Sequence, residues 1–227
     1  MELFNPEVAV QSLGPLFAGL MLTVLLTVIV IVLALVLGLV VALARLYGPS
    51  PLSWAVAAYV EVIRGTPLLL QLIYIYYVLP EIGIRLDAFT AAIIGLTLNY
   101  AAYISEVYRA GIQAIGKGQS DAAAALGMTR GLALRRIILP QAVRLVIPAL
   151  GNFLISLFKD TALCSVVSVQ EVLFTAQLMA ARNYQYFTLY TVVGALYFVV
   201  GFLAARLVDV LERRNRAGYR RRRRARA

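Results

Sequence analysis

Residues 8–44 carry no charged side chain, and this stretch limits the possible folds more than any other feature of the sequence. A helix rises about 1.5 Å per residue, so about 20 apolar residues cross the ~30 Å hydrocarbon core of a membrane. The stretch exceeds that length, follows Glu2 and Glu7 instead of a basic flank, and lacks the cleavage site of a signal peptide. It therefore predicts a membrane-spanning helix, which we place at about residues 16–44.

Four further apolar segments have the length of a membrane span. They lie at about residues 54–79, 88–108, 147–170 and 187–207, and are separated by turns and polar stretches. The segment from Glu171 to Tyr186, between the last two spans, is expected to be a loop. Hydrophobic residues make up 62% of the chain, well above the ~45–50% of soluble domains. The expected fold is an all-α polytopic membrane protein with five transmembrane helices. Residues 1–212 form its transmembrane domain, and residues 213–227 form an Arg-rich cytoplasmic tail.

The positions of the basic residues set the expected orientation. The formal net charge is +10, and residues 206–227 hold ten arginines against two acids. With the N-terminus outside, the cytoplasmic segments carry 17 basic residues, whereas the external segments carry Arg85 and Arg182. Because basic residues gather on the cytoplasmic side, this count predicts an N-out, C-in topology. Contact between the tail and anionic lipids, at about 1 kcal/mol per basic residue, accounts for the charge without a nucleic-acid partner.

The residue types that form metal sites and disulfides are scarce in the sequence. The chain has no His and one Cys, Cys164, which excludes an internal disulfide and a thiolate metal cluster. Residues 111–117 approach a phosphate-binding loop, but Gly118 occupies the position where such a loop needs Ser or Thr to hold Mg²⁺. We therefore expect no catalytic residue, no metal site and no cofactor in this chain.

The polar stretch between the third and fourth spans predicts two short helices on the cytoplasmic face. Ser120 can cap the first helix, a run of alanines continues it, and Gly127 suits its end. Thr129 can cap the second helix, over residues 130–138, before Pro140. The small side chains would let the surface of another protein approach closely. The alternative is a solvated connecting loop.

The same stretch resembles the EAA loop of ABC importer permeases. In that family the loop is a coupling helix that docks into the ATPase subunit. Asp121 stands here in place of the usual Glu, which shortens the reach of the carboxylate. The resemblance implies that loop 117–140 is the ATPase-coupling site. Its matching residues are Asp121, Ala122, Ala123, Gly127, Ile137, Leu139 and Pro140.

Three other segments are similar to signatures of polar amino-acid permeases of the histidine, glutamine and arginine type. They are residues 61–69, 103–112 and 156–163. The resemblance implies a permease subunit of an ATP-driven importer for polar amino acids in the bacterial inner membrane, and not an enzyme. It also implies a dimer of ATP-binding subunits that hold ATP and Mg²⁺. A second permease copy, identical or homologous, and an extracytoplasmic amino-acid-binding protein would complete the importer.

Charged and polar residues inside the spans are candidates for the substrate path. Lys159 and Asp160 lie inside the fourth span, where each charge costs about 2.5–3.5 kcal/mol. Adjacent helix positions point about 100° apart, so these two do not form a private ion pair. They either face the path or pair with Glu61, Arg64 or Glu106 from other spans. Hydrogen bonds, to the substrate or between helices, are expected from Asn99, Asn152, Thr66 and Gln71.

Glu61 and Arg64 lie three residues apart and therefore share one helix face. We expect them to form a structural charge pair. Gly65, Thr66 and Pro67 follow directly and would loosen or kink the second helix. Because broken helices in transporters place free backbone groups at substrate sites, a place on the substrate path is the other interpretation.

Two other function classes are alternatives for a basic five-span protein. A YidC-like insertase resembles it in topology and basic tail, but such an insertase has an Arg in its first core span, where this chain has no charge. It also leaves the EAA-type loop unexplained. An ion-coupled secondary amino-acid carrier would use Lys159 or Asp160 for ion coupling and would need no ATPase.

Overall fold

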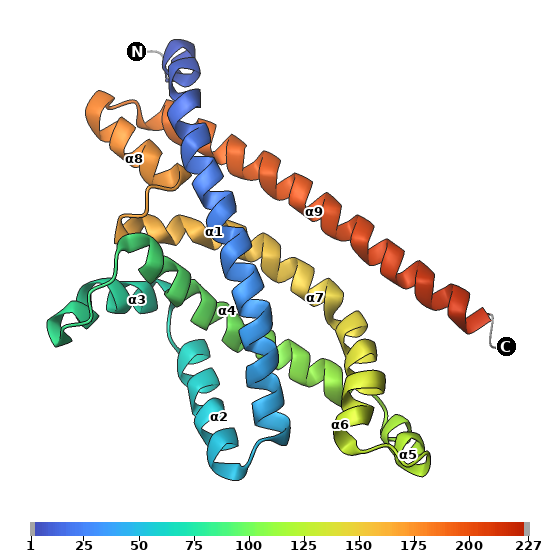
Figure 1. Cartoon of the computed structure of the whole chain (residues 1–227). Coiled ribbons are helices and arrows are strands. Elements are labelled where there is room, and N and C mark those ends of the chain that lie inside the picture. Colours follow the sequence, from blue (N-terminus) through green and yellow to red (C-terminus); the bar gives the residue numbers. More distant parts are fainter. Residues whose placement is uncertain (1–2, 225–227) are drawn as a thin grey trace.

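The computed structural model describes residues 3–224, with side chains up to residue 213. Every regular element in this range is helical (Figure 1). The α-helices are α1 (Pro6–Tyr47), α2 (Ser50–Gly65), α3 (Leu68–Ile73), α4 (Ala88–Gln113), α5 (Lys117–Ala125), α6 (Arg130–Ala133), α7 (Leu139–Asp160), α8 (Val172–Asn183) and α9 (Tyr186–Arg224). Short π-helical turns cover Tyr74–Val78 and Leu134–Ile138, and 3-10 turns cover Leu79–Ile82 and Thr161–Val167.

Four continuous helical segments are long and apolar enough to cross a membrane. They are Pro6–Tyr47, Ala88–Gln113, Arg130–Val167 and Tyr186–Arg213. Ser50–Gly65 and Leu68–Ile82 also pass the test together, although they are bent by 108°. The described chain thus has four spans, or five if the bent pair counts as one. The five segments picked out in the sequence fall on these helices.

The bend between α2 and α3 follows from the backbone chemistry of Pro67. Proline has no N–H to donate, and its ring disfavours a helical conformation in the residue before it. Thr66 is accordingly extended, with φ −120° and ψ 146°, and Pro67 has ψ 135°. The helix therefore ends at Gly65 and resumes at Leu68, where the sequence predicted a kink.

The core is built around α1, which runs along α4 and also contacts α8 and α9 (Figure 1). Leu26 and Val30 of α1 are buried in one cluster with Leu96 and Ile104 of α4. A second cluster joins the first half of α1 to α8 and α9; its members include Leu16, Leu20, Val172, Ala176, Leu189 and Val193. Small residues permit this packing, because a Cβ at Gly19 would lie 2.9 Å from the Val172 Cα.

The segment from Glu171 to Tyr186, predicted to be a loop, contains the 12-residue helix α8. Glu171 caps it: its Oε1 accepts a hydrogen bond of 2.7 Å from the Phe174 backbone N–H. The prediction was wrong because Glu is not among the usual N-cap residues. Glu171 is fully buried, and its Oε2 also accepts hydrogen bonds from Tyr197 (2.8 Å) and Thr23 (3.4 Å). One carboxylate thereby joins α1, α8 and α9.

Helices α5 and α6 form the helix-turn-helix predicted from the sequence, at the end of the molecule opposite α8 (Figure 1). Gly127 adopts a positive φ of 73° just after α5, as its assignment to the helix end predicted. Thr129 caps α6 by accepting from the Leu132 N–H. Ser120, however, does not cap α5: the helix already begins at Lys117, and Ser120 lies inside it. Gly116 occupies the N-cap position instead.

The contact at Gly19 generates a stability prediction. Gly19→Ala places its new methyl group 2.9 Å from a backbone atom of Val172, which no side-chain rotation can relieve. We expect a loss of about 1–3 kcal/mol of stability from overpacking. Gly14→Ala, on the same helix, meets nothing within 4 Å and gains helix propensity. In detergent, Gly19→Ala should lower the thermal unfolding temperature and Gly14→Ala should not; equal temperatures would contradict the close packing of α1 against α8.

Candidate functional site

An open cavity of about 520 Å³ lies where the broken second span meets α4 and α7. The backbone from α2 to α3 forms one wall, and the middle turns of α4 and the last turns of α7 form the others. The lining residues are Arg64, Gly65, Thr66, Pro67, Leu68, Asn99, Tyr100, Tyr103, Phe153, Ser156 and Asp160. Sequence positions about 100 residues apart are thereby brought to one site.

Two lining residues carry opposite charges and come from different helices. Asp160 is the last residue of α7, and its Oδ2 accepts a hydrogen bond of 2.6 Å from the Tyr100 hydroxyl on α4. Arg64, near the end of α2, stacks over the Tyr103 ring at 5.4 Å from its centroid. Each charge is thus held by an aromatic residue of α4. The cavity presents one cation and one anion to anything that enters it.

A chain of amide and hydroxyl groups braces the break between α2 and α3. The Gln71 side-chain amide donates to the Ile63 carbonyl (2.8 Å) and to the Thr66 hydroxyl (2.8 Å). Asn99, buried on α4, donates to the Gln71 side-chain oxygen at 3.0 Å. Three candidates for the substrate path therefore bond to one another. Thr66 and Asn99 also line the cavity, whereas Gln71 supports the wall from behind.

The remaining path candidates separate in the structure. Asp160 lines the cavity, but Lys159 is exposed and does not. Their divergence is the one expected for adjacent helix positions. Asn152 is exposed and lies outside the lining. Sequence reasoning missed the aromatic lining residues Tyr100, Tyr103 and Phe153, whose spacing on α4 and α7 is that of ordinary core residues.

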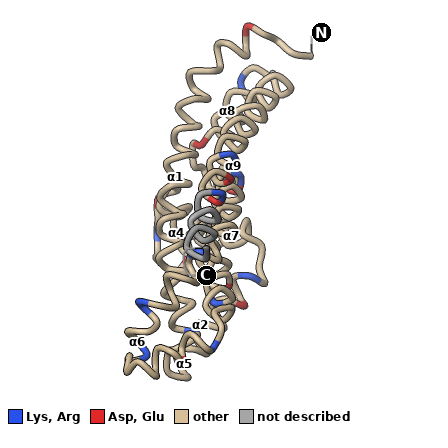
Figure 2. The backbone as a smooth tube through the Cα atoms, turned by 90° about the vertical axis from the view of Figure 1, so that its right-hand side faces the viewer, with Lys and Arg blue, Asp and Glu red and all other residues tan. Residues whose placement is uncertain are grey.

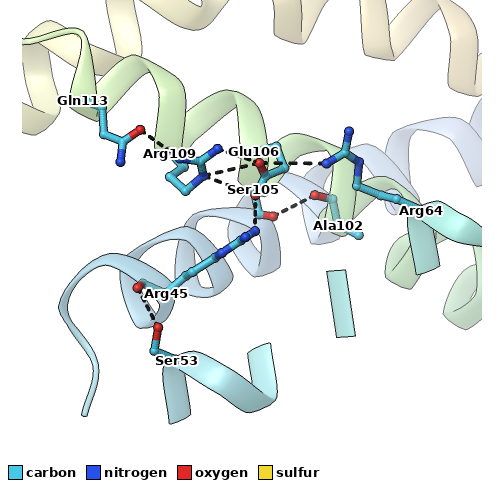
Figure 3. A network of polar contacts seen from close by, with 8 residues as sticks. All are labelled: Arg45, Ser53, Arg64, Ala102, Ser105, Glu106, Arg109 and Gln113. Carbon is cyan, nitrogen blue, oxygen red and sulfur yellow. Dashed lines mark hydrogen bonds and ion pairs between the residues drawn. The ribbon is translucent and has the colours of Figure 1, made fainter. Parts of the chain in front are cut away.

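The charge pair expected between Glu61 and Arg64 is not formed. Arg64 instead forms an ion pair with Glu106 of α4, at 3.8 Å (Figure 3). Glu106 also binds Arg45 of α1 and Arg109 of α4, the latter at 2.8 Å. Glu61 and Arg64 have the spacing that an i, i+3 pair needs. The Arg64 guanidinium nevertheless contacts the Tyr103 ring and the Glu106 carboxylate of α4 instead. Among these charges, the i, i+3 spacing of Glu106 and Arg109 was readable from the sequence.

The seven residues of the EAA-type motif are grouped at the α5–α6 end. Asp121, Ala122, Gly127 and Pro140 are exposed there; Ile137 and Leu139 are half-buried, and Ala123 is buried. Leu126, directly after α5, is 79% exposed, so a large apolar side chain lies on the surface of the loop. Basic residues gather around this end (Figure 2). The arrangement presents a small-residue surface with one apolar projection.

The family assignment agrees with this geometry. Residues 34–217 match the family model of the binding-protein-dependent transport system inner membrane component. The chain belongs to this family. The permease is therefore a multi-pass inner-membrane protein of the ABC importers, and neither the insertase nor the secondary carrier is favoured.

The similar proteins within this family are permeases of amino-acid transporters. The permease is 41% identical over 210 residues to the L-cystine transport system permease protein TcyB of Bacillus subtilis, covering 92% of this chain and 90% of that protein. It is 38% identical over 200 residues to the arginine transport system permease protein ArtQ of the same species, covering 88% and 91%. A crystal structure of an amino acid ABC transporter with histidines matches with a TM-score of 0.87 and 38% identity, covering 92% and 98%. The MetNI methionine ABC transporter shares the fold, with a TM-score of 0.70 and 22% identity.

The brace at the break generates a prediction about stability. Gln71→Leu would leave the Asn99 amide and the Ile63 carbonyl without their partner, at a cost of about 1–3 kcal/mol. The same substitution at Gln170, which is exposed, should cost far less. Circular dichroism melting curves of the two purified variants measure the difference. Similar unfolding temperatures would show that the brace does not hold the break.

Proposed function

We propose that this permease moves an amino acid through the cavity beside the broken span, by alternating access driven by a separate ATPase. The main support for this proposal is that Arg64 and Asp160, of opposite charge, line one cavity of about 520 Å³. The α-carboxylate of an amino acid would bind the Arg64 guanidinium, and its α-ammonium group would bind Asp160. Both are charge-assisted contacts, which are the stronger kind of hydrogen bond. The names of the relatives support an amino-acid substrate.

The rest of the lining supports a substrate without a strong positive charge on its side chain. Asp160 is the acidic residue among the lining residues, and the α-ammonium group occupies it in this proposal. Phe153 lies two turns before Asp160 on α7, with Tyr103 and Leu68 on the other walls. These residues offer apolar and aromatic surface and the Tyr hydroxyl. A neutral polar side chain matches that surface better than a cationic one.

Loop 117–140 is proposed as the ATPase-coupling site, on the cytoplasmic side. Its exposed small residues and Leu126, together with the basic residues around α5 and α6 (Figure 2), support this orientation, N-out and C-in. ATP and Mg²⁺ would be held by a dimer of ATPase subunits, and this chain would hydrolyse nothing itself. A second permease copy, identical or homologous, would complete the path. An extracytoplasmic amino-acid-binding protein would deliver substrate at the α8 end.

The Arg-rich tail is proposed to bind anionic lipid headgroups. Helix α9 continues without a break from its apolar part to Arg224. A helix that leaves the membrane on the cytoplasmic side carries its basic residues past the anionic leaflet, where each contributes about 1 kcal/mol. The tail would then fix the position of α9 in the membrane and take no part in transport.

The pocket assignment predicts the effect of removing one charge. Asp160→Asn should weaken amino-acid binding to the purified permease–ATPase complex by about 10-fold or more, because a hydrogen bond to a charged group contributes about 1.5–3 kcal/mol. Lys159→Gln changes the adjacent charge, which lies outside the cavity, and should leave affinity within about twofold. Radiolabelled amino acids measure both. Equal losses would contradict the assignment, and uptake into liposomes by the permease without an ATPase would overturn the proposed function.

The coupling assignment predicts a second effect. Gly127→Asp adds a carboxylate to the proposed docking surface and strains a residue with φ 73°, so ATPase co-purification should be lost while the chain remains inserted. Gly83→Asp imposes a comparable backbone strain, at φ 88°, outside loop 117–140, and should retain the ATPase. Retention of the ATPase by the Gly127 variant would exclude α5 as the coupling helix.

A further inference from the structure

One carboxylate, that of Glu106, holds three arginines from three helices (Figure 3). Arg109 contacts it with Nη2 at 2.8 Å and also bonds Gln113. Arg45 of α1 contacts the other oxygen of the same carboxylate. Arg64 is the most distant, at 3.8 Å. Three positive charges face one negative charge, so the cluster has a formal excess of two positive charges.

Arg64 has the weakest hold on this cluster and the best access to a ligand. Its side chain is 43% exposed, against 24% for Arg45 and 30% for Arg109. Among the described residues, it alone both binds Glu106 and lines the cavity. Its guanidinium lies over Tyr103, which precedes Glu106 by three residues and therefore shares its face of α4. A carboxylate in the cavity and the carboxylate of Glu106 would approach the same cation from neighbouring positions.

We propose that Glu106 is a positioning residue that competes with the carboxylate of the substrate for Arg64. This inference rests on the proposed function of the cavity. When substrate occupies the cavity, its carboxylate takes Arg64, and Glu106 keeps Arg45 and Arg109. When substrate leaves, Arg64 returns to Glu106. The exchange needs only a rotation of the Arg64 side chain, because this side chain already contacts Glu106 and lines the cavity.

Competition of this kind predicts opposite changes in amino-acid affinity when Glu106 and Arg109 are replaced. Arg109 and Arg64 both bind the Glu106 carboxylate. Glu106→Gln removes the competing charge and should tighten amino-acid binding by about two- to fivefold, the range of a partly exposed ion pair. Arg109→Gln frees the Glu106 oxygen at 2.8 Å for Arg64, and should weaken binding by a similar factor. A purely structural network would lose affinity in both variants.

The experiment uses the purified permease–ATPase complex. The probe is the radiolabelled amino acid that most raises the unfolding temperature of the wild-type complex, chosen from the standard L-amino acids and L-cystine. Glu61→Gln is the matched control: it makes the same change on the helix of Arg64, three residues away, but forms no ion pair with it among the described contacts. Its affinity should equal that of the wild type.

Each outcome bears on one of the two proposals. Opposite shifts in Glu106→Gln and Arg109→Gln support the competition, whereas unchanged or uniformly weaker binding overturns it, as does equal tightening by Glu61→Gln. If Glu106→Gln does not assemble, the double variant Glu106→Gln with Arg109→Gln replaces it, because it restores the net charge of the cluster. The double variant should bind the amino acid more tightly than Arg109→Gln alone. Equal or weaker binding overturns the competition. If no amino acid binds the wild type, or Asp160→Asn leaves binding intact, the cavity assignment itself fails.

Discussion

The interruption of the second span at Thr66–Pro67 is the constraint on which the other features of this permease depend. A membrane offers no water to backbone groups that a broken helix leaves unpaired, so protein groups must satisfy them. Gln71 does so by donating to the Ile63 and Thr66 carbonyls, and Asn99 fixes Gln71 from α4. The break is therefore stabilised by a side chain of α3 and a side chain of α4. A bend of 108° can persist there because its polar groups have partners.

The break also creates the site. A straight helix would have packed its side chains along α4, whereas the bend leaves an open cavity bounded by α4 and α7. It places Arg64 at the end of α2, where the guanidinium contacts Tyr103 and Glu106. Through Glu106, the end of α2 is tied to Arg45 on α1. The same interruption thus shapes the cavity and joins it to a charge cluster that connects three helices.

The fold was largely readable from the sequence, because long apolar segments and one proline determine where helices cross and where one breaks. Helices α5 and α6 were predicted from helix caps and alanine propensity, whereas the coupling role of loop 117–140 rests on the resemblance. The partners of individual side chains were not, since they depend on which helices pack together. Glu61 and Arg64 share a helix face, yet Arg64 bonds across to α4; Thr66, Gln71 and Asn99 were recognised as polar but not as one brace. Glu171 is a similar case, because only the packing of α1 and α9 around it reveals why a buried carboxylate caps α8.

The positions of α4 and α7 indicate how an ATPase could act on the cavity in the proposed mechanism. Both helices lead into the α5–α6 loop, α4 at its C-terminal end and α7 at its N-terminal end. Both also supply the cavity walls, and the Tyr100–Asp160 hydrogen bond of 2.6 Å joins them there. About 15 Å of continuous helix separates Tyr103 from the end of α4. Helices transmit displacement along their axes because their backbone bonds are satisfied internally. A shift of the loop would therefore move Tyr100 relative to Asp160. It would also move Tyr103, whose ring contacts the Arg64 guanidinium.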